Sequence, residues 1–193
     1  MARLIAGWEK PDAGAIRWAE ASVGCLVQLV PQDPGPSLNP WLTVFQAVSE
    51  PLAIQGRDTS SAHQMLIQCK VAAALFSQRT ATLSGGQKAR VAIARALTAC
   101  PRLLILDETF TSLDLITRQQ LTEILLRMQS EQRLAIVWVL HDLDLAGQVA
   151  SQIAVMDDGR IVELESPRQL ATGAAHPVTK ALLSARPDRS SPR

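Results

Sequence analysis

The distribution of apolar residues along the chain predicts alternating strands and helices. Residues 103–106 are an uninterrupted apolar run, and residues 134–140 form a longer one that ends before a histidine. Such runs are typical of strands buried on both faces of a parallel sheet. Between them, apolar residues recur at helical spacing from 116 to 128. Strand, helix and strand in this order predict a parallel crossover unit and therefore an α/β fold.

The segment between the prolines at 31–36 and the first of these strands has mostly helical periodicity. Three prolines in residues 31–36 exclude regular structure and mark the point where the chain leaves one subdomain for another. The helical pattern over 43–97 is expected to break at Pro51, at 56–61 and at 78–84. We therefore expect a helical subdomain over about 36–98, inserted within the α/β core.

Shorter strands are predicted near both ends of the chain. Residues 15–18 alternate between apolar and polar, and residues 25–30 include a short apolar run. The runs at 153–156 and 161–164 flank Asp-Asp-Gly, a turn sequence that favours a β-hairpin.

Composition limits the class of protein without identifying it. A chain of 193 residues with 47% hydrophobic content can bury one α/β core, and nothing demands two independent domains. With 19 basic and 18 acidic residues the net charge is +1, which gives no electrostatic support for a nucleic-acid partner. No apolar run approaches the ~18 residues of a membrane helix, so any membrane role is expected to be peripheral. The odd number and wide spacing of Cys25, Cys69 and Cys100 indicate reduced thiols.

A possible anion site lies at residues 83–87, Leu-Ser-Gly-Gly-Gln. Ser84 is a suitable N-cap for the apolar helix that follows, and the amides of Gly85, Gly86 and Gln87 would point outward at the positive end of its dipole. A phosphate would fit there. Taken alone, Ser-Gly-Gly is more often only a loop and a cap.

A pair of carboxylates follows the first buried run. Asp107 and Glu108 stand where parallel strands end, at the edge where α/β sheets bind ligands. Because neighbouring strand residues face opposite ways, one carboxylate could serve a metal and the other a water molecule. An apolar run followed by Asp-Glu is weak evidence by itself.

The run over residues 83–97 resembles, almost position for position, the signature motif and following helix of the ABC-type ATPases. The resemblance extends from residue 2 to about 185 and implies the P-loop NTPase (ABC ATPase) fold, with a parallel-sheet core and a helical subdomain. It implies that Ser84, Gly85, Gly86 and Gln87 contact a nucleotide held by the opposite subunit. It also implies that Asp107 supports the Mg²⁺ hydration shell and that Glu108 orients the water attacking the γ-phosphate.

Three further residues match the family in the expected order. Gln32 resembles the Q-loop glutamine that senses Mg²⁺ and the γ-phosphate, beside a loop that docks on the membrane subunit. Asp114, in Ser-Leu-Asp at 112–114, resembles the D-loop, which crosses the dimer interface. His141 resembles the switch histidine that contacts the γ-phosphate. Alone, these residues would be read as a solvated glutamine, a helix N-cap and a structural histidine.

The resemblance is closest to the ATPase subunits of dipeptide, oligopeptide and nickel importers, on the segments 32–40 and 176–183. It implies ATP and Mg²⁺ as cofactors, with a second ATPase subunit and transmembrane permease subunits as partners. The location it implies is peripheral, on the cytoplasmic face of the inner membrane. Departures include Thr109, where proline is common, and Leu140, where serine or threonine usually precedes the histidine.

The family's other phosphate-binding loop, Gly-x-x-x-x-Gly-Lys-[Ser/Thr], does not occur in these residues, and no lysine follows a glycine. Met1 stands where the family has a leucine just beyond that loop. We therefore expect residues 1–193 to be a partial single ABC ATPase domain that lacks the N-terminal strands and the P-loop, and to bind ATP weakly or not at all alone.

Three functions remain open at this point. The chain could be an ATP-hydrolysing subunit that energises a peptide or nickel importer through ATP-driven dimer closure. It could instead be a degenerate, non-hydrolysing subunit or gene fragment whose signature loop completes a partner's ATP site. A non-transport ABC protein is the third possibility.

Overall fold

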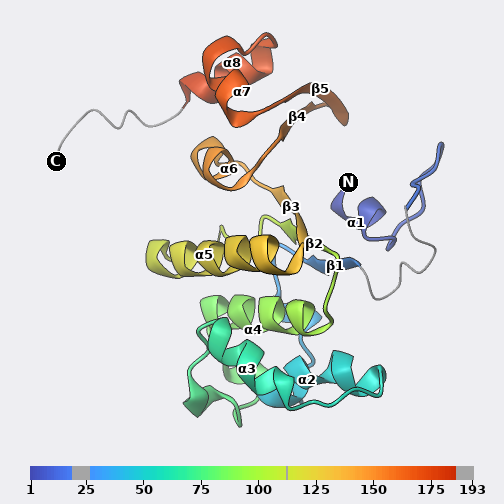
Figure 1. The fold of residues 1–193 in the computed structure, drawn as a ribbon, viewed down its shortest axis with the longest axis vertical. Helices are drawn as coiled ribbons and strands as arrows, with labels where there is room; N and C mark the ends of the chain where they lie inside the picture. The colour runs from blue at the N-terminus through green and yellow to red at the C-terminus, as the bar shows by residue number, and fades with distance from the viewer. Residues whose placement is uncertain (19–26, 112, 186–193) are drawn as a thin grey trace, which may run out of the picture. The chain divides into compact units, whose positions relative to one another are not determined.

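The computed structural model describes residues 1–18, 27–111 and 113–185, and it divides the chain into two compact units, Met1–Val139 and Leu140–Arg193. The first unit is built on a parallel sheet with strand order β1-β2-β3 (Figure 1). The strands are β1 (Val27–Val30), β2 (Leu103–Asp107) and β3 (Ala135–Val139). Both ladders are parallel, which confirms the predicted α/β fold and both predicted buried strands.

The sheet lies between helices on its two faces. Leu104 and Leu106 belong to the same buried cluster as residues of α4 (Gly85–Thr98) and α5 (Leu115–Gln132). Ile105 belongs instead to a cluster with residues of the short helix α1 (Ala2–Ile5). Alternate residues of a strand point to opposite faces, so both faces of β2 are covered by apolar contacts and its residues 103–106 are all apolar.

Helical segments occupy the chain between β1 and β2. They are the 3₁₀ turns η1 (Gly35–Ser37), η2 (Ala73–Leu75) and η3 (Thr80–Thr82), and the helices α2 (Val44–Ile54), α3 (Ser61–Gln68) and α4. Their buried apolar residues join the cluster that covers Leu104 and Leu106. The limits of an inserted subdomain at 36–98 stay a prediction.

The predicted helix break at Pro51 is wrong, because α2 runs through it from Val44 to Ile54. A capping box between Thr43 and Gln46 fixes the start of the helix. Proline removes one backbone donor inside a helix, yet Val48 and Leu52 on either side are fully buried. Packing of these two side chains offsets the lost hydrogen bond. The predicted break at 56–61 is confirmed, since Gly56 follows the helix with a φ of +65°.

The second unit contains the predicted hairpin. β4 (Ile153–Asp157) pairs antiparallel with β5 (Arg160–Glu165), and Gly159 in the turn has a φ of +75°. The unit also contains α6 (Leu143–Val149), α7 (Pro167–Gly173) and α8 (Pro177–Ser184). The Glu163 carboxylate accepts hydrogen bonds from the Ala175 and His176 amides, at 2.8 and 3.3 Å, which ties β5 to the start of α8.

The predicted strand at 15–18 is wrong, because these residues have no regular structure. Ile16 is 42% exposed and Trp18 37%, so the alternation gives no buried face that could hold a strand in a sheet. Of the predicted run at 25–30, residues 25 and 26 lie outside the described residues, and the rest is β1.

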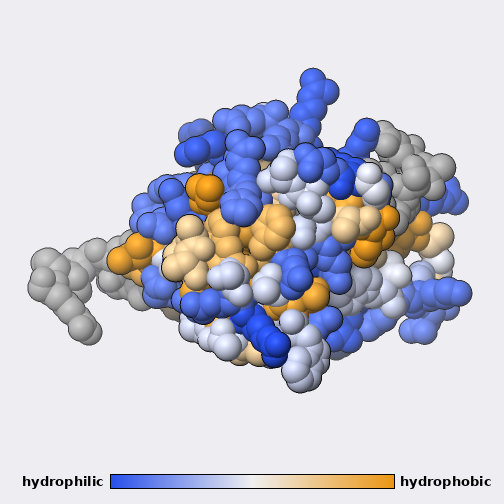
Figure 2. All heavy atoms as spheres, turned by 90° about the horizontal axis from the view of Figure 1, so that it is seen from below, coloured by the Kyte–Doolittle hydropathy of each residue, from blue (hydrophilic) through white to orange (hydrophobic). Residues whose placement is uncertain are grey.

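The face of the molecule seen from below carries both apolar and hydrophilic side chains. Figure 2 shows apolar side chains gathered near the middle of this face, with hydrophilic ones around them. Large apolar side chains exposed on α2 and α3 are Ile54 and Ile67.

Among the helices of the described residues, none combines the length and hydropathy needed to cross a membrane. Cys69 and Cys100 are free thiols, as predicted, and Cys25 lies outside the described part.

Candidate functional site

The strand register places two of the predicted residues at one edge of the sheet. Val30 is aligned with Leu106, and Asp107 with Val139. Asp107 is therefore the last residue of β2, half-buried, and Gln32 lies two residues beyond the end of β1, exposed. The carboxyl ends of parallel strands are the ligand-binding edge of an α/β sheet.

Glu108 turns out of the strand by a backbone conformation that its residue type rarely adopts. Its φ is +49°, in the left-handed region, and its amide donates to the Val139 carbonyl at 3.1 Å. The Thr111 hydroxyl donates to the Glu108 carbonyl at 2.8 Å. The expectation that strand alternation sets the directions of Asp107 and Glu108 is therefore wrong, because β2 ends at Asp107. Such a conformation costs on the order of 1–3 kcal/mol and is concentrated at functional sites.

Thr109 links the Glu108 turn to the end of β1. Its side chain is buried, and its hydroxyl donates to the Val30 carbonyl at 2.9 Å, with the Pro31 carbonyl further away at 3.4 Å. The residue following Glu108 is thus hydrogen-bonded to the backbone that leads to Gln32. The sequence marked Thr109 only as a departure from the family, and nothing in the local pattern reveals this contact.

The Leu-Ser-Gly-Gly-Gln segment forms a capped helix start. Ser84 is the N-cap of α4, its hydroxyl accepts from the Gln87 amide at 3.4 Å, and the Gln87 side chain accepts from the Ser84 amide at 2.9 Å. The expectation that the Gln87 amide is free for an anion is therefore wrong, since the capping box uses it. The amides of Gly85 and Gly86 lie in the first helical turn, where amides have no acceptor within the helix.

The two glycines of this segment are open toward the outside of the chain. Among the described residues outside the α4 backbone, a Cβ built on Gly85 would meet no atom within 4 Å, and one on Gly86 would meet the Leu113 side chain at 3.7 Å. Packing against these residues therefore requires neither glycine, although glycine disfavours a helix relative to alanine. Glycine at both positions leaves the backbone accessible to the close approach of another molecule.

Asp114 caps the helix that follows the carboxylates. Its carboxylate accepts from the Thr117 amide at 2.9 Å and from the Thr117 hydroxyl at 2.7 Å, and Thr117 also receives a hydrogen bond from Arg90 of α4. The hydrogen bonds from Thr117 lower the pKa of Asp114, with a smaller contribution from the Arg90 charge. The N-cap interpretation of Asp114 is thus confirmed. Its role across a dimer interface stays a prediction, and Ser112 lies outside the described residues.

Exposed apolar side chains adjoin this cap. Leu115 and Ile116 are 77% and 69% exposed, although the helical pattern assigned Ile116 to a buried face. Leu113 is buried, and its side chain lies 3.7 Å from a Cβ built on Gly86. The start of α5 and the start of α4 are therefore neighbours, with both glycines and an apolar pair facing outward.

His141 belongs to the second unit. It is exposed, follows the last residue of β3 by two positions and precedes Asp142, the N-cap of α6. The described structure therefore brings Gln32, Asp107 and Glu108 to one sheet edge and joins Ser84–Gly86 to the start of α5. A position for His141 beside either group stays a prediction.

The oxygen donors at the sheet edge suit a hard cation. Asp107 offers a carboxylate and Gln32 a side-chain amide oxygen, the ligand types that Mg²⁺ accepts. Within the described ranges no group of three or more His, Cys, Asp or Glu side chains could hold a metal by itself. A magnesium ion here would therefore keep several waters and take further oxygens from a phosphate.

Comparison with known proteins agrees with this geometry. The family model described as ABC transporter matches residues 1–111. A probable D,D-dipeptide transport ATP-binding protein of Escherichia coli K12 is 33% identical over 192 residues, covering 97% of this chain and 62% of the relative. A nickel import ATP-binding protein of Shigella boydii is 34% identical over 182 residues, covering 86% of this chain and 68% of the relative. The chain thus spans about two thirds of these curated relatives, and 47% of a probable peptide transporter subunit of Sinorhizobium fredii.

Solved structures share the fold. The cbiO1 subunit of Clostridium perfringens, part of an ABC transporter complex, has a TM-score of 0.74 and 28% identity over 87% of this chain and 72% of its own. A dimeric ATP-binding cassette in a post-hydrolysis state with ADP and phosphate has a TM-score of 0.78 and 25% identity, over 86% and 79% of the two chains. The fold is therefore that of the P-loop NTPases, as expected from the sequence. The family model matches more than half of the residues of this chain, and several relatives are more than 30% identical to it. The chain therefore belongs to the ABC transporter family.

Proposed function

We propose that this protein is the ATP-binding and ATP-hydrolysing subunit of an ABC importer for peptides or nickel. The observation that carries the proposal is the division of its polar groups into two sites. One is the sheet edge with Gln32, Asp107 and Glu108, and the other is the outward-facing start of α4. The names of the similar curated proteins, dipeptide and nickel transport ATP-binding proteins, support the cargo class.

The sheet edge has the groups that phosphoryl transfer to water requires. Asp107 and Gln32 would hold Mg²⁺, which neutralises charge on the phosphates when bound. Glu108 lies one residue further and would accept a hydrogen bond from the attacking water and then its proton. The backbone bond from the Glu108 amide to the Val139 carbonyl keeps the carboxylate's attachment point in place at the strand end. His141 would contact the γ-phosphate.

The α4 start would act on a nucleotide held by another subunit. The Gly85 and Gly86 amides are at the positive end of the α4 dipole and can donate to phosphate oxygens. The exposed Leu115 and Ile116 beside them are apolar surface that a second subunit would bury. We infer a dimer, with a copy or a paralogue, that closes when ATP binds and is attached to transmembrane permease subunits. It would lie peripherally on the cytoplasmic face of the membrane.

Substitution of Glu108 tests this proposal. In the complete gene product purified with its permease subunits, Glu108→Gln should lower the kcat for MgATP by about 10²-fold or more, because the amide cannot accept a proton. The Kd for ATP should stay within about threefold, since Glu108 is not assigned to binding. Glu123→Gln is the matched control, because Glu123 is exposed on α5 and pairs only with Gln119 among the contacts described. Full turnover by the Glu108 variant would refute the hydrolytic role.

A non-hydrolysing subunit is the second candidate, favoured by the openness of Gly85 and Gly86 toward an outside ligand. It predicts that hydrolysis by a mixed complex with a paralogous ATPase depends on Gly85 and Gly86 but is unchanged by Glu108→Gln. Uptake of labelled dipeptide or of nickel ions by the reconstituted complex would then identify the cargo in either case.

A further inference from the structure

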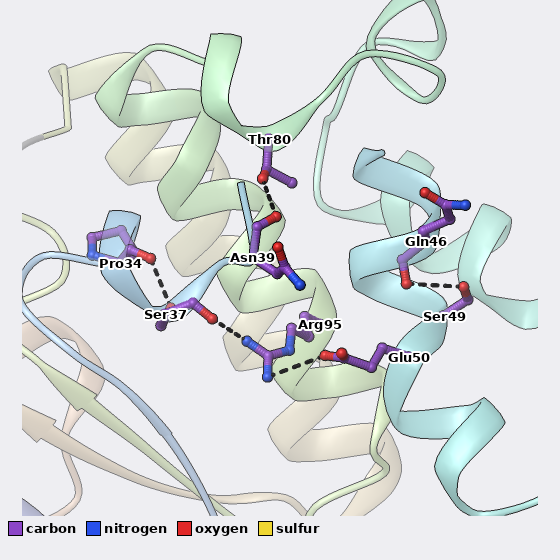
Figure 3. Close-up of polar contacts among 8 residues, drawn as sticks. All are labelled: Pro34, Ser37, Asn39, Gln46, Ser49, Glu50, Thr80 and Arg95. Atoms are coloured by element: carbon purple, nitrogen blue, oxygen red, sulfur yellow. Dashed lines mark hydrogen bonds and ion pairs between the residues drawn. The ribbon is translucent and has the colours of Figure 1, made fainter. Parts of the chain in front are cut away.

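Arg95 of α4 connects two segments that are distant in sequence. One arm of its guanidinium donates to the Ser37 carbonyl in η1, and the other pairs with the Glu50 carboxylate of α2 at 3.4 Å (Figure 3). The side chains of Arg95 and Glu50 are 34% and 37% exposed, so the ion pair itself is worth little. The bond to the carbonyl is charge-assisted and fixes a backbone position, which a mobile ion pair does not.

Thr80 holds the same segment from the other side. It is 1% exposed, and its hydroxyl donates to the Asn39 carbonyl at 2.6 Å (Figure 3). Its amide donates to the Leu42 carbonyl at 3.0 Å. Thr80 stands four residues before Ser84. Residues 32–40 are here called the Gln32 segment. Thr80, which precedes residues 83–87, is hydrogen-bonded to this segment at Asn39, and Arg95 of α4, the helix that follows, is hydrogen-bonded to it at Ser37.

The Gln32 segment also has hydrogen bonds within itself. The Gly35 amide donates to the Asp33 carboxylate at 3.0 Å, and the Ser37 hydroxyl donates to the Pro34 carbonyl at 2.7 Å. Leu38 is 3% exposed and belongs to the main apolar cluster. These contacts restrain the segment between the two points at which Arg95 and Thr80 hold it.

We propose that Arg95 and Thr80 are positioning residues that make the Gln32 segment and the start of α4 one mechanical body, so that displacement of either is transmitted to the other. The proposal rests on the proposed function for the roles of Gln32 and Ser84 at ATP sites. It assigns to Arg95 and Thr80 the alignment of one site with the other, without contact to nucleotide.

Hydrogen exchange of the nucleotide-free complete protein tests the link directly. The reporters are the Ser37 and Leu38 amides, bonded to Pro34 and Gly35, and the Lys88 amide, bonded to the Ser84 carbonyl. Arg95→Met should raise exchange at all three by about tenfold, the typical worth of a hydrogen bond to a charged group. Arg127→Met is the control on the exposed part of α5 and should change none of them. Faster exchange at Ser37 and Leu38 with unchanged exchange at Lys88 would overturn the proposal.

Two conservative variants distinguish loss of the link from misfolding of the protein. Arg95→Lys keeps the charge but can reach only one of the two partners, so its exchange rates should lie between those of the wild type and Arg95→Met. Thr80→Val keeps the shape of a buried side chain and loses the hydroxyl, and should raise exchange at Ser37, Leu38 and Lys88 together. Variants that leave the Lys88 rate unchanged while their circular dichroism is native would contradict the link.

A kinetic measurement separates alignment from stability. Well below the unfolding temperature of every variant, Arg95→Met should lower kcat for MgATP by about tenfold or more with KM changed less than about twofold, because misplacement affects catalysis more than binding. An unchanged kcat in a fully folded variant would show that Arg95 is only structural. A wild-type protein without ATPase activity would refute the proposed function, whereas the exchange rates would still decide the link.

Discussion

The hydroxyl of Thr109 should be worth more to stability than its methyl group. Thr109 is 1% exposed, and its hydroxyl donates to the Val30 carbonyl at 2.9 Å, joining the turn at Glu108 to the end of β1. Thr109→Val replaces the hydroxyl by a methyl group of similar size, so no cavity forms. Thr109→Ser keeps the hydroxyl and removes the methyl group instead. The two variants therefore separate hydrogen bonding from packing.

The magnitudes follow from the burial and the geometry. Thr109→Val leaves a buried carbonyl without its hydroxyl donor, which costs about 1–3 kcal/mol. Thr109→Ser removes one buried methyl group, which costs about 1 kcal/mol. For a protein of this size, about 2 kcal/mol lowers Tm by roughly 4–8 °C. Thr109→Val should therefore be the more destabilising variant, by about 1 kcal/mol.

Urea unfolding followed by tryptophan fluorescence measures this difference in the unit that contains Thr109. Trp138 of β3 packs on Phe110, the residue after Thr109, with ring centroids 5.2 Å apart, so it reports on this part of the core. A packing role alone predicts the opposite order, with Thr109→Ser destabilised and Thr109→Val close to wild type. That order would refute the hydrogen-bond argument and the link between the Glu108 turn and β1.

Three further predictions concern the site and the thiols. Gly85→Ala or Gly86→Ala should fold normally and gain up to about 1 kcal/mol, because the added Cβ meets no atom closer than 3.7 Å. The same change should lower ATP turnover of the assembled complex; unchanged turnover would exclude close approach of a ligand. Hydrogen bonding lowers the pKa of Asp114, so its stabilisation is present above the unfolded pKa and is lost as pH falls through the folded pKa. Asp114→Asn should therefore flatten the acid limb of unfolding curves measured against pH. Burial raises the pKa of the Cys69 thiol to about 12, so peptide mass spectrometry at pH 8 should find iodoacetamide on the exposed Cys100 and not on Cys69. Above about pH 9, where only the unfolded Cys69 thiol ionises, stability should fall as pH rises.

The parts of the fold that could be predicted are those in which the type of each residue directly indicates its burial or its backbone conformation. The first four residues of β2 are all apolar because both faces of the strand are covered. The turn at Gly159 needs a residue that accepts a positive φ. Pro51 gives a misleading local signal, because its effect on the helix is outweighed by the burial of Val48 and Leu52 on either side of it. The segment 15–18 alternates correctly but has no face to bury, which its own residues cannot reveal.

The positions of the site residues were predictable only where strand ends fix them. Parallel strands bring their carboxyl ends to one edge, so Gln32 and Asp107 follow from the pattern once the strands are identified. The left-handed conformation of Glu108 and the bond from Thr109 to Val30 do not follow, because both depend on the register between strands far apart in sequence. The partners of Arg95 are equally distant, and a helical arginine on a mixed face carries no local sign of them.

In the proposed dimer, residues 83–87 would begin a helix of one subunit and contact the nucleotide of the other. The side chains and amides of Ser84 and Gln87 bond to one another in the capping box, which fixes the first turn of α4 without any ligand. This removes the Gln87 amide from an anion site but presents the Gly85 and Gly86 amides in a fixed orientation. Among the described residues outside the α4 backbone, no atom lies within 4 Å of a Cβ built on Gly85. In the proposed dimer, the Gly85 and Gly86 amides would donate to a phosphate of the nucleotide that the other subunit holds.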